Sequence, residues 1–245
     1  MRIFLLLLSL TLSLAPPALA QGDASFESAR KAMVAQQLAA RGLSDARVLA
    51  AMSKVPRHLF APPRLASLAY GDHPLPISGG QTISQPYIVG LMSEWAMVKP
   101  GDKVLEVGTG SGYQAAVLAE LTDQVYTIEI RPDLAREAAA RLKELGYSKV
   151  QVRTGDGYLG WPEQAPFDAI LVTAAARGVP PALAEQLKEG GRLVIPLGPE
   201  GGAQTLVRLR SVKGKLVEEA SLPVRFVPLV RSPVQEPAPP PALPP

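Results

Sequence analysis

The chain has 245 residues, of which 47% are hydrophobic, and its formal net charge is only +3. This length suits one α/β domain with a large core, and the small net charge leaves no electrostatic footprint for nucleic acid. Because the sequence contains no cysteine, disulfides, zinc–thiolate sites and cysteine nucleophiles are excluded. The two histidines, His58 and His73, argue against a multi-histidine metal site, so no metal is expected.

The first 20 residues have the pattern of a secretory signal peptide. Arg2 is a minimal basic start, residues 3–14 are rich in leucine, and Ala18-Leu19-Ala20 fits the small-x-small cleavage rule. The apolar run is short for a membrane span, so we expect cleavage and export, with an uncleaved anchor as the alternative. The chain is therefore divided into a signal peptide (1–20), a folded domain (21–231) and a Pro-rich tail (232–245) that is predicted to be disordered.

Helical patterns come first in the mature chain. Apolar spacing predicts helices over residues 25–41 and 45–52, with Gly42 as the C-cap of the first. His58 follows in a proline-rich region and is interpreted as a packing or surface residue rather than a base. Residues 70–86 show no periodicity and many turn formers, which suits either a functional segment or a surface connector. A helix is then predicted over 86–97, with Pro86 in its first turn.

The rest of the domain alternates strands and helices. Strands are predicted over 104–107, 124–129, 149–153, 167–173 and 192–197, and helices over 114–121, 132–145 and 180–187. Two later segments, 206–211 and 216–219, form a candidate hairpin across Lys213-Gly214, and 224–230 has strand character. The pattern predicts an α/β fold: a doubly wound, mostly parallel sheet of Rossmann-like type, with N-terminal helices and added C-terminal strands. Ligands of such sheets bind at the carboxyl ends of the strands.

A glycine-rich turn follows the first strand of this sheet. Its spacing is G-x-G-x-G at Gly108, Gly110 and Gly112, which is neither G-x-G-x-x-G nor a P-loop. Glycines allow a ligand to approach the backbone, and the following helix directs its free N–H groups at the turn. The second strand ends in Glu129, whose carboxylate can accept hydrogen bonds from two ribose hydroxyls. Together they indicate a cofactor that contains a nucleoside, although the loop alone would fit an ordinary βα turn equally well.

Three loops at strand ends converge in this scheme: the glycine turn, Glu129 and Asp156-Gly157. The layout resembles class I S-adenosylmethionine-dependent methyltransferases, which implies that Glu129 holds the ribose and Asp156 meets the adenine amino group. A Rossmann dehydrogenase is the competing interpretation, but it would place a pyrophosphate on G-x-G-x-x-G, which the chain lacks.

Over residues 33–231 the sequence also closely resembles protein-L-isoaspartate O-methyltransferases. The most specific block is G-Q-T-I-S-Q-P-Y at 80–87, and further matches are V-P-R at 55–57, P-L-P-I at 74–77, L-E-V-G-T-G-S-G-Y at 105–113, G-D-G at 155–157, F-D-A-I at 167–170 and R-F-V-P-L-V at 225–230. In this family the 80–87 block lies over cofactor and substrate. The resemblance implies a catalytic, substrate-binding role for Ser84 and a position near the substrate for Val227. The residues that the resemblance assigns to S-adenosylmethionine are Thr82, Ile83, Glu106, Gly108, Thr109, Gly110, Gly112, Glu129, Asp156 and Gly157.

Two positions depart from the pattern of some relatives. Val89 stands where some have histidine, and Val230 stands where some have threonine. Both positions lie near the cofactor in the family, so these two contacts are not carried over to this chain.

The reaction that the resemblance implies is methyl esterification of the α-carboxylate of L-isoaspartyl residues in damaged proteins. The ester then closes spontaneously to a succinimide, which hydrolyses partly to normal aspartate. Because the carboxylate is already ionised at neutral pH, alignment rather than a strong general base is required, and the hydroxyl of Ser84 or Thr82 can orient it.

Two other function classes remain open: a methyltransferase fold that only binds isoaspartyl proteins, and a methyltransferase acting on small molecules or nucleic acid. The low net charge and the absence of an N-P-P-Y motif argue against nucleic acid. The expected partners are proteins or peptides that contain isoaspartyl residues, with no nucleic acid and no stable membrane association after cleavage. We expect a monomer in the periplasm, with the cytoplasm, where most relatives act, as the alternative.

Overall fold

The computed structural model describes residues 17–231, with side chains described from residue 24 onward. The Pro-rich tail and the first 16 residues of the predicted signal peptide lie outside the described residues. Among the described residues, no helix combines the length and apolar character needed to cross a bilayer.

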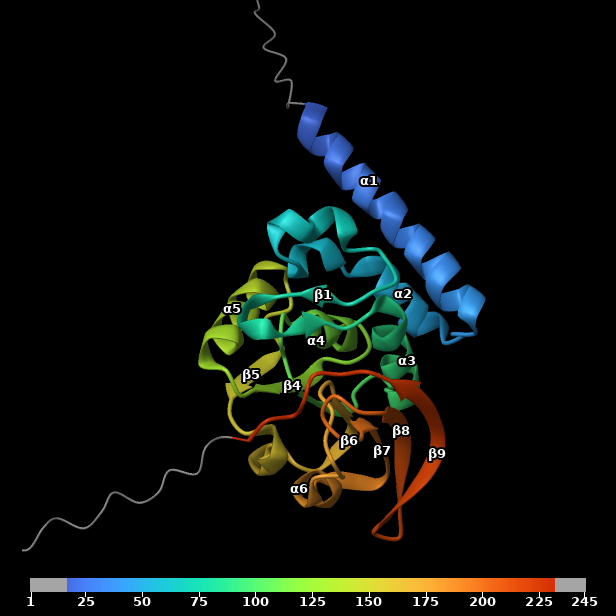
Figure 1. Cartoon of the computed structure of the whole chain (residues 1–245), viewed down its shortest axis with the longest axis vertical. Helices are drawn as coiled ribbons and strands as arrows, with labels where there is room; N and C mark the ends of the chain where they lie inside the picture. Colours follow the sequence, from blue (N-terminus) through green and yellow to red (C-terminus); the bar gives the residue numbers. More distant parts are fainter. Residues whose placement is uncertain (1–16, 232–245) are drawn as a thin grey trace, which may run out of the picture.

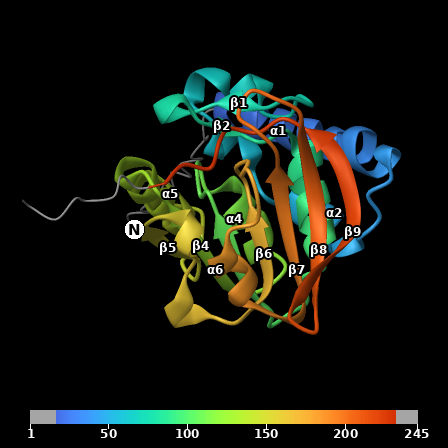
Figure 2. The ribbon, with the colours of Figure 1, turned by 60° about the horizontal axis from the view of Figure 1, so that its bottom comes forward.

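The centre of the molecule is a mostly parallel sheet. Within residues 17–231 it contains seven strands in the order β5-β4-β3-β6-β7-β8-β9, and Figure 2 shows them side by side. The first five strands in this order run parallel, and β8 and β9 are antiparallel additions. The doubly wound α/β fold and the added C-terminal strands predicted from the sequence are therefore confirmed. The strand bounds are β3 Lys103–Val107, β4 Gln124–Glu129, β5 Gln151–Thr154, β6 Phe167–Val172, β7 Leu187–Leu197, β8 Gln204–Val212 and β9 Lys215–Val224.

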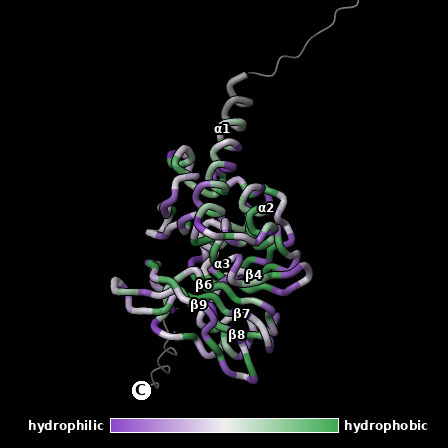
Figure 3. The backbone as a smooth tube through the Cα atoms, turned by 90° about the vertical axis from the view of Figure 1, so that its right-hand side faces the viewer, coloured by the Kyte–Doolittle hydropathy of each residue, from purple (hydrophilic) through white to green (hydrophobic). Residues whose placement is uncertain are grey.

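Helices cover both faces of the sheet, because strands with apolar residues on both sides must be buried on both. Val104 packs into the hydrophobic cluster that contains residues of α3 and α4, whereas the next residue, Leu105, packs into the cluster around Leu183 of α6. In Figure 3 the central strands β6 and β7 include strongly hydrophobic stretches. The helix bounds are α3 Pro86–Ala96, α4 Tyr113–Ala119, α5 Pro132–Glu144 and α6 Pro181–Glu185.

The N-terminal part begins with a long helix, α1 Pro17–Met33, which extends well beyond the rest of the molecule in Figure 1. It continues through a π-helical turn and a 3-10 turn to Gly42, whose φ of 96° ends the helix as predicted. The start differs from the predicted residue 25, because helical backbone continues upstream through Ala20. The next helix, α2 Ala46–Lys54, is capped by Asp45, whose carboxylate accepts from the N–H groups of residues 47 and 48.

The irregular segment 70–86 contains two very short strands, β1 Leu75–Pro76 and β2 Thr82–Ile83, which pair with each other. His58 stacks on Phe26 with ring centroids 4.0 Å apart and bonds the Tyr70 hydroxyl through Nδ1. These contacts give His58 the packing position that the sequence suggested.

The C-terminal hairpin of β8 and β9 is confirmed, with Lys213 and Gly214 at φ of 52° and 71° in its turn. Such a turn, with positive φ at both central residues, matches the twist of the flanking strands. Of the segment 224–230, which has strand character in the sequence, only Val224 belongs to β9, and Pro228 forms an isolated parallel β-bridge with Ala175. Residues 225–231, which we call the C-terminal strap, instead run back past β2 towards α5 (Figure 2). The strap is bound to Ala175, whose N–H donates to Val227 O and whose carbonyl accepts from Leu229 N–H.

Candidate active site

The glycine loop after β3 is fixed by its neighbours on both sides. The N–H groups of Gly108 and Thr109 donate to the Ile128 carbonyl at 2.8 and 3.2 Å. Gly108 has a φ of 100°, and a Cβ at this position would lie 2.4 Å from Thr173 Oγ1. That hydroxyl donates to the Gly108 carbonyl at 2.7 Å and approaches the Val107 carbonyl at 3.1 Å. Glycine is therefore required at position 108 both by backbone angle and by the space that Thr173 occupies.

Glu129 stands at the carboxyl end of β4 and is 6% exposed. Its Oε2 accepts from the Gly110 N–H at 2.8 Å, and its Oε1 accepts from the Arg131 N–H at 3.1 Å. An ionised carboxylate has about four lone-pair sites, so these two bonds leave capacity for a ligand. The carboxylate is thus held in place by backbone donors and still able to receive two hydroxyl groups.

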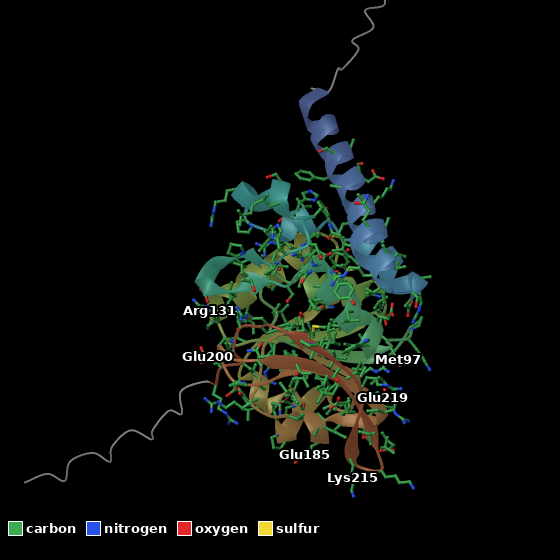
Figure 4. The ribbon with its side chains drawn as sticks, turned by 45° about the vertical axis from the view of Figure 1, so that its right-hand side comes forward. Met97, Arg131, Glu185, Glu200, Lys215 and Glu219 are labelled. Carbon is green, nitrogen blue, oxygen red and sulfur yellow. The ribbon has the colours of Figure 1, made fainter. Side chains whose placement is uncertain are left out.

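A cavity of about 220 Å³ lies beside Glu129 at the carboxyl ends of β3, β4 and β6. The sheet order reverses between β3 and β6, and this switch point is where open α/β sheets bind ligands. Figure 4 labels Arg131, which lies on its rim and donates to the Gly79 carbonyl at 3.4 Å. We call this the first cavity; its walls are Gln81, Thr82, Val107, Gly108, Gly110, Ile128, Glu129, Ile130, Arg131, Gly157, Thr173, Ala174, Val227, Pro228, Leu229 and Val230.

The structure brings half of the predicted cofactor residues to this cavity. Those in its wall are Thr82, Gly108, Gly110, Glu129 and Gly157. The other five are not among its wall residues. Ile83 is buried in the core, Gly112 stands at the N-cap of α4, and Asp156 accepts from the Tyr158 N–H at 2.8 Å. Direct contact of these residues with a cofactor stays a prediction from the resemblance.

Glu106 and Thr109 belong to a buried hydrogen-bonded chain under the loop. Glu106 is 0% exposed, its Oε2 accepts from Thr127 Oγ1 at 2.6 Å, and Thr127 Oγ1 lies 2.7 Å from Thr109 Oγ1. Burial raises the pKa of Glu106 from its ordinary value of 4.5 to about 8; the Thr127 hydrogen bond opposes the rise, and the charge of Glu129 adds to it. Glu106 is therefore mostly neutral at pH 7 and supports the loop from below.

A second cavity of about 460 Å³ adjoins the first, and the two share Thr82, Thr173 and Val227 as wall residues. Ser84 and Val227, the residues predicted to contact substrate, both line it. Its walls are mainly apolar: Pro74, Thr82, Ser84, Gln85, Ile88, Thr173, Val224, Arg225, Phe226 and Val227. The first cavity thus opens beside Glu129, whose carboxylate suits a nucleoside, and Ser84 lines the second cavity.

Sequence reasoning missed three parts of this site: Thr173, Arg131, and the contribution of Pro228 and Leu229 of the C-terminal strap to the wall of the first cavity. Thr173 directly follows β6, at the carboxyl end of a strand next to the switch point, and that position is a usable signal. The strap residues Pro228 and Leu229 carry no such local signal, because they reach the first cavity through pairing with Ala175.

The strand order, the glycine loop and the acid at the end of β4 together define a class I methyltransferase fold. The model of the family described as Protein-L-isoaspartate(D-aspartate) O-methyltransferase (PCMT) matches residues 28–233. The chain is 57% identical over 204 residues to a protein-L-isoaspartate O-methyltransferase of Gloeobacter violaceus, covering 83% of this chain and 100% of that protein. The chain belongs to the protein-L-isoaspartate(D-aspartate) O-methyltransferase family.

Solved structures agree with this assignment. One protein-L-isoaspartate O-methyltransferase aligns with a TM-score of 0.72 at 31% identity, and the match covers 81% of this chain and 65% of that one. A Plasmodium falciparum protein-L-isoaspartate O-methyltransferase in complex with S-adenosyl-L-homocysteine also aligns with a TM-score of 0.72, at 28% identity, covering 83% of this chain and 99% of that one.

Proposed function

We propose that this protein uses S-adenosylmethionine to methylate the α-carboxylate of L-isoaspartyl residues in damaged proteins and so starts their repair through a succinimide. The observation that carries the proposal is the pair of adjoining cavities in a chain of this family. The first offers a carboxylate and a glycine loop, the second offers Ser84, and Thr82, Thr173 and Val227 lie between them.

The wall of the first cavity fits S-adenosylmethionine. Glu129 has lone pairs free for the two ribose hydroxyls, Gly110 brings backbone close to the ligand, and Ile130 and Leu229 offer apolar surface for a base. When bound, this cofactor supplies a sulfonium-linked methyl group that is already activated for transfer to an oxygen nucleophile.

The residues of the second cavity fit a carboxylate substrate. Such a group is ionised at neutral pH, so it needs orientation and exclusion of water rather than removal of a proton. The half-buried Ser84 hydroxyl can donate to one carboxylate oxygen and leave the other free to react. The apolar residues Ile88, Phe226 and Val227 limit the access of water to this cavity.

The proposal is tested with labelled S-adenosylmethionine and two peptides that differ only in an aspartyl or isoaspartyl linkage. We expect base-labile label in the isoaspartyl peptide and none in the aspartyl peptide. A protein that binds isoaspartyl peptide without turnover, or that methylates both peptides equally, would contradict it.

We further propose that the protein is exported, loses its first 20 residues and acts in the periplasm as a monomer without stable membrane association. Support comes from the basic, leucine-rich and small-residue pattern of residues 1–20. Fractionation of the producing cell and light scattering of the mature protein test location and oligomeric state. Recovery of the full-length protein in the cytoplasm, or of a dimer, would contradict the respective part.

A further inference from the structure

The second cavity has one charged side chain among the described residues of its wall, and that residue is Arg225. Arg225 is exposed and directly follows the last residue of β9. The remaining wall residues are apolar or carry hydroxyl or amide groups. A guanidinium at the edge of an otherwise neutral cavity favours anionic ligands there.

The backbone that carries Arg225 is held on both sides. Upstream, Val224 pairs with Gln204 of β8. Downstream, the side chain of Gln204 binds the next residue twice: its Oε1 accepts from the Phe226 N–H at 2.6 Å, and its Nε2 donates to the Phe226 carbonyl at 3.3 Å. Gln204 is 4% exposed. Because the backbone is fixed, the position of the guanidinium is restricted to what its own side-chain rotations allow, which favours specific recognition.

The reacting carboxylate itself is a poor partner for Arg225. Esterification removes the negative charge of that group, so an ion pair with it would be stronger before the reaction than in the transition state and would slow turnover. The neutral hydroxyl of Ser84 can orient the reacting group without this cost. A different carboxylate of the substrate, one that does not react, keeps its charge throughout. The guanidinium can bind such a group without slowing the reaction.

We propose that Arg225 is a specificity-determining residue that binds the side-chain carboxylate of an aspartate or glutamate next to the isoaspartyl residue of the substrate. This inference rests on the proposed function. The contact is equally strong before and during methyl transfer, so it lowers KM and leaves kcat unchanged. Arg225 also lies at the surface, so the contact weakens as salt is added.

The test compares three isoaspartyl peptides, one with glutamate before the isoaspartyl residue, one with glutamate after it and one with glutamine at both places. For the wild-type protein we expect one glutamate peptide to have a KM about two- to fivefold below that of the glutamine peptide, the range of exposed ion pairs. Arg225→Gln should abolish this preference, Arg225→Lys should keep part of it, and kcat should stay within about twofold in both variants.

Arg136→Gln is the matched control, because Arg136 is an exposed arginine of α5 outside both cavities. It removes the same charge and should preserve the preference, which separates local binding from net charge. Equal KM values for all three peptides with the wild type, or an unchanged preference in Arg225→Gln, overturn the inference and leave the proposed function intact. Failure of the wild type to methylate even the glutamine peptide overturns both. Melting curves of Arg225→Gln and Arg225→Lys show whether either variant is folded, and either one suffices for the test.

Discussion

Glu129 makes two backbone hydrogen bonds that exist before any ligand arrives. From sequence its expected role concerns the ribose alone, whereas the structure also makes it the acceptor for Gly110 and Arg131 N–H groups. For Glu129→Ala we expect loss of charge-assisted hydrogen bonds of about 1.5–3 kcal/mol. At about 1.4 kcal/mol per tenfold, affinity for S-adenosylmethionine should fall roughly 10- to 100-fold in calorimetric titration.

The same substitution should also lower the melting temperature without cofactor, because the Gly110 N–H loses its acceptor. Glu129→Gln is the control, since it keeps one acceptor oxygen and the side-chain volume, and it should lie between wild type and alanine in both measurements. Unchanged affinity in Glu129→Ala would mean that the ribose is held elsewhere.

Ser84 lies between β2 and α3, where serine often caps a helix. In the structure the N-cap of α3 is Gln85, and its side chain makes no capping bond. This leaves the Ser84 hydroxyl, in the wall of the second cavity, available for substrate. We expect Ser84→Ala to lower the methylation rate at saturating peptide at least about tenfold, a barrier increase of about 1.4 kcal/mol.

Cofactor affinity and melting temperature of Ser84→Ala should stay near wild type. Thr82→Ala is the comparison, because Thr82 lines both cavities two residues away and could share the role. A variant at position 84 that turns over at the wild-type rate and only melts earlier would make Ser84 a structural residue.

The raised pKa of Glu106 predicts that the free energy of unfolding depends on pH. Its pKa is raised to about 8 in the folded protein against an ordinary 4.5, so between these values the folded state binds more protons than the unfolded state. Stability from this group therefore falls as pH rises from about 4.5 to 8. Glu106→Gln keeps the shape of the side chain but does not titrate. As pH rises across this range, its free energy of unfolding should therefore increase relative to that of the wild type, by an amount on the order of a few kcal/mol.

Urea unfolding of both proteins at pH 5 and pH 8, without cofactor, measures this difference. Groups other than Glu106 cancel in the comparison, since they are common to both proteins. A difference in unfolding free energy that is the same at both pH values would show that Glu106 ionises normally in the folded state.

At the scale of the elements, the C-terminal strap contributes to the walls of both cavities, and the side chain of Gln204 holds the start of the strap in place. Gln204 holds Phe226 by two hydrogen bonds, and the strap residues that follow line the first cavity. Gln204→Ala should cost about 1–3 kcal/mol of stability, because the partly buried N–H and carbonyl groups of Phe226 lose their partner. It should also weaken binding of both cofactor and peptide, since Val227 belongs to both walls.

Hydrogen exchange at the Phe226 amide measures this directly, and we expect its protection to fall in Gln204→Ala. Gln124→Ala is the control, because its amide donates to the Gly101 carbonyl at the amino end of the parallel strands. Phe226 exchange should be unchanged there. Equal protection in wild type and Gln204→Ala would show that pairing with Ala175 alone holds the strap.

The elements that could be predicted are those with local signals. The apolar runs of β3, β4 and β6 and the glycines between β3 and α4 are read directly from the chain. Valine and phenylalanine favour strands and so predict strand character for the strap, whereas its path depends on Gln204, 22 residues earlier, and on Ala175. β7 begins at Leu187 rather than at the predicted 192, because Gly190 and Gly191 lie in an irregularity of the strand and not in a turn before it.

The candidate site divides in the same way. Glu129 and the glycine loop follow from spacing, whereas the burial of Glu106 depends on the register that places it opposite Thr127. No sequence pattern supplies that register. Ser84 and Val227 came from resemblance rather than from chemistry, and the structure places both in one cavity wall without testing their roles.

At the scale of the whole molecule, α1 spans the end of the predicted signal peptide and the start of the folded domain. The helix passes through Ala20 without a break. Further along, α1 contacts the body: Phe26 stacks on His58, Arg30 Nε donates to the Ser53 carbonyl at 2.6 Å, and Met33 is buried. Removal of residues 1–20 should therefore shorten α1 by about one turn and leave these contacts in place.

We expect the exported protein to begin at Gln21. Cleavage removes Arg2, the one charged side chain of the leader, so the formal net charge falls from 25 − 22 = +3 to 24 − 22 = +2. The melting temperature of a protein produced from residue 21 should equal that of the full chain within about 2 °C, because the contacts of Phe26, Arg30 and Met33 with the body remain and a surface change of this kind costs under about 0.5 kcal/mol. Mass spectrometry of the periplasmic fraction identifies the first residue.

Ala18→Asp and Ala20→Asp, which violate the small-residue rule at the cleavage site, should retain the leader, whereas Ser9→Ala within the apolar run should be processed normally. An intact Met1 in the wild type, or normal processing of both aspartate variants, would mean that residues 1–20 are not a cleaved signal.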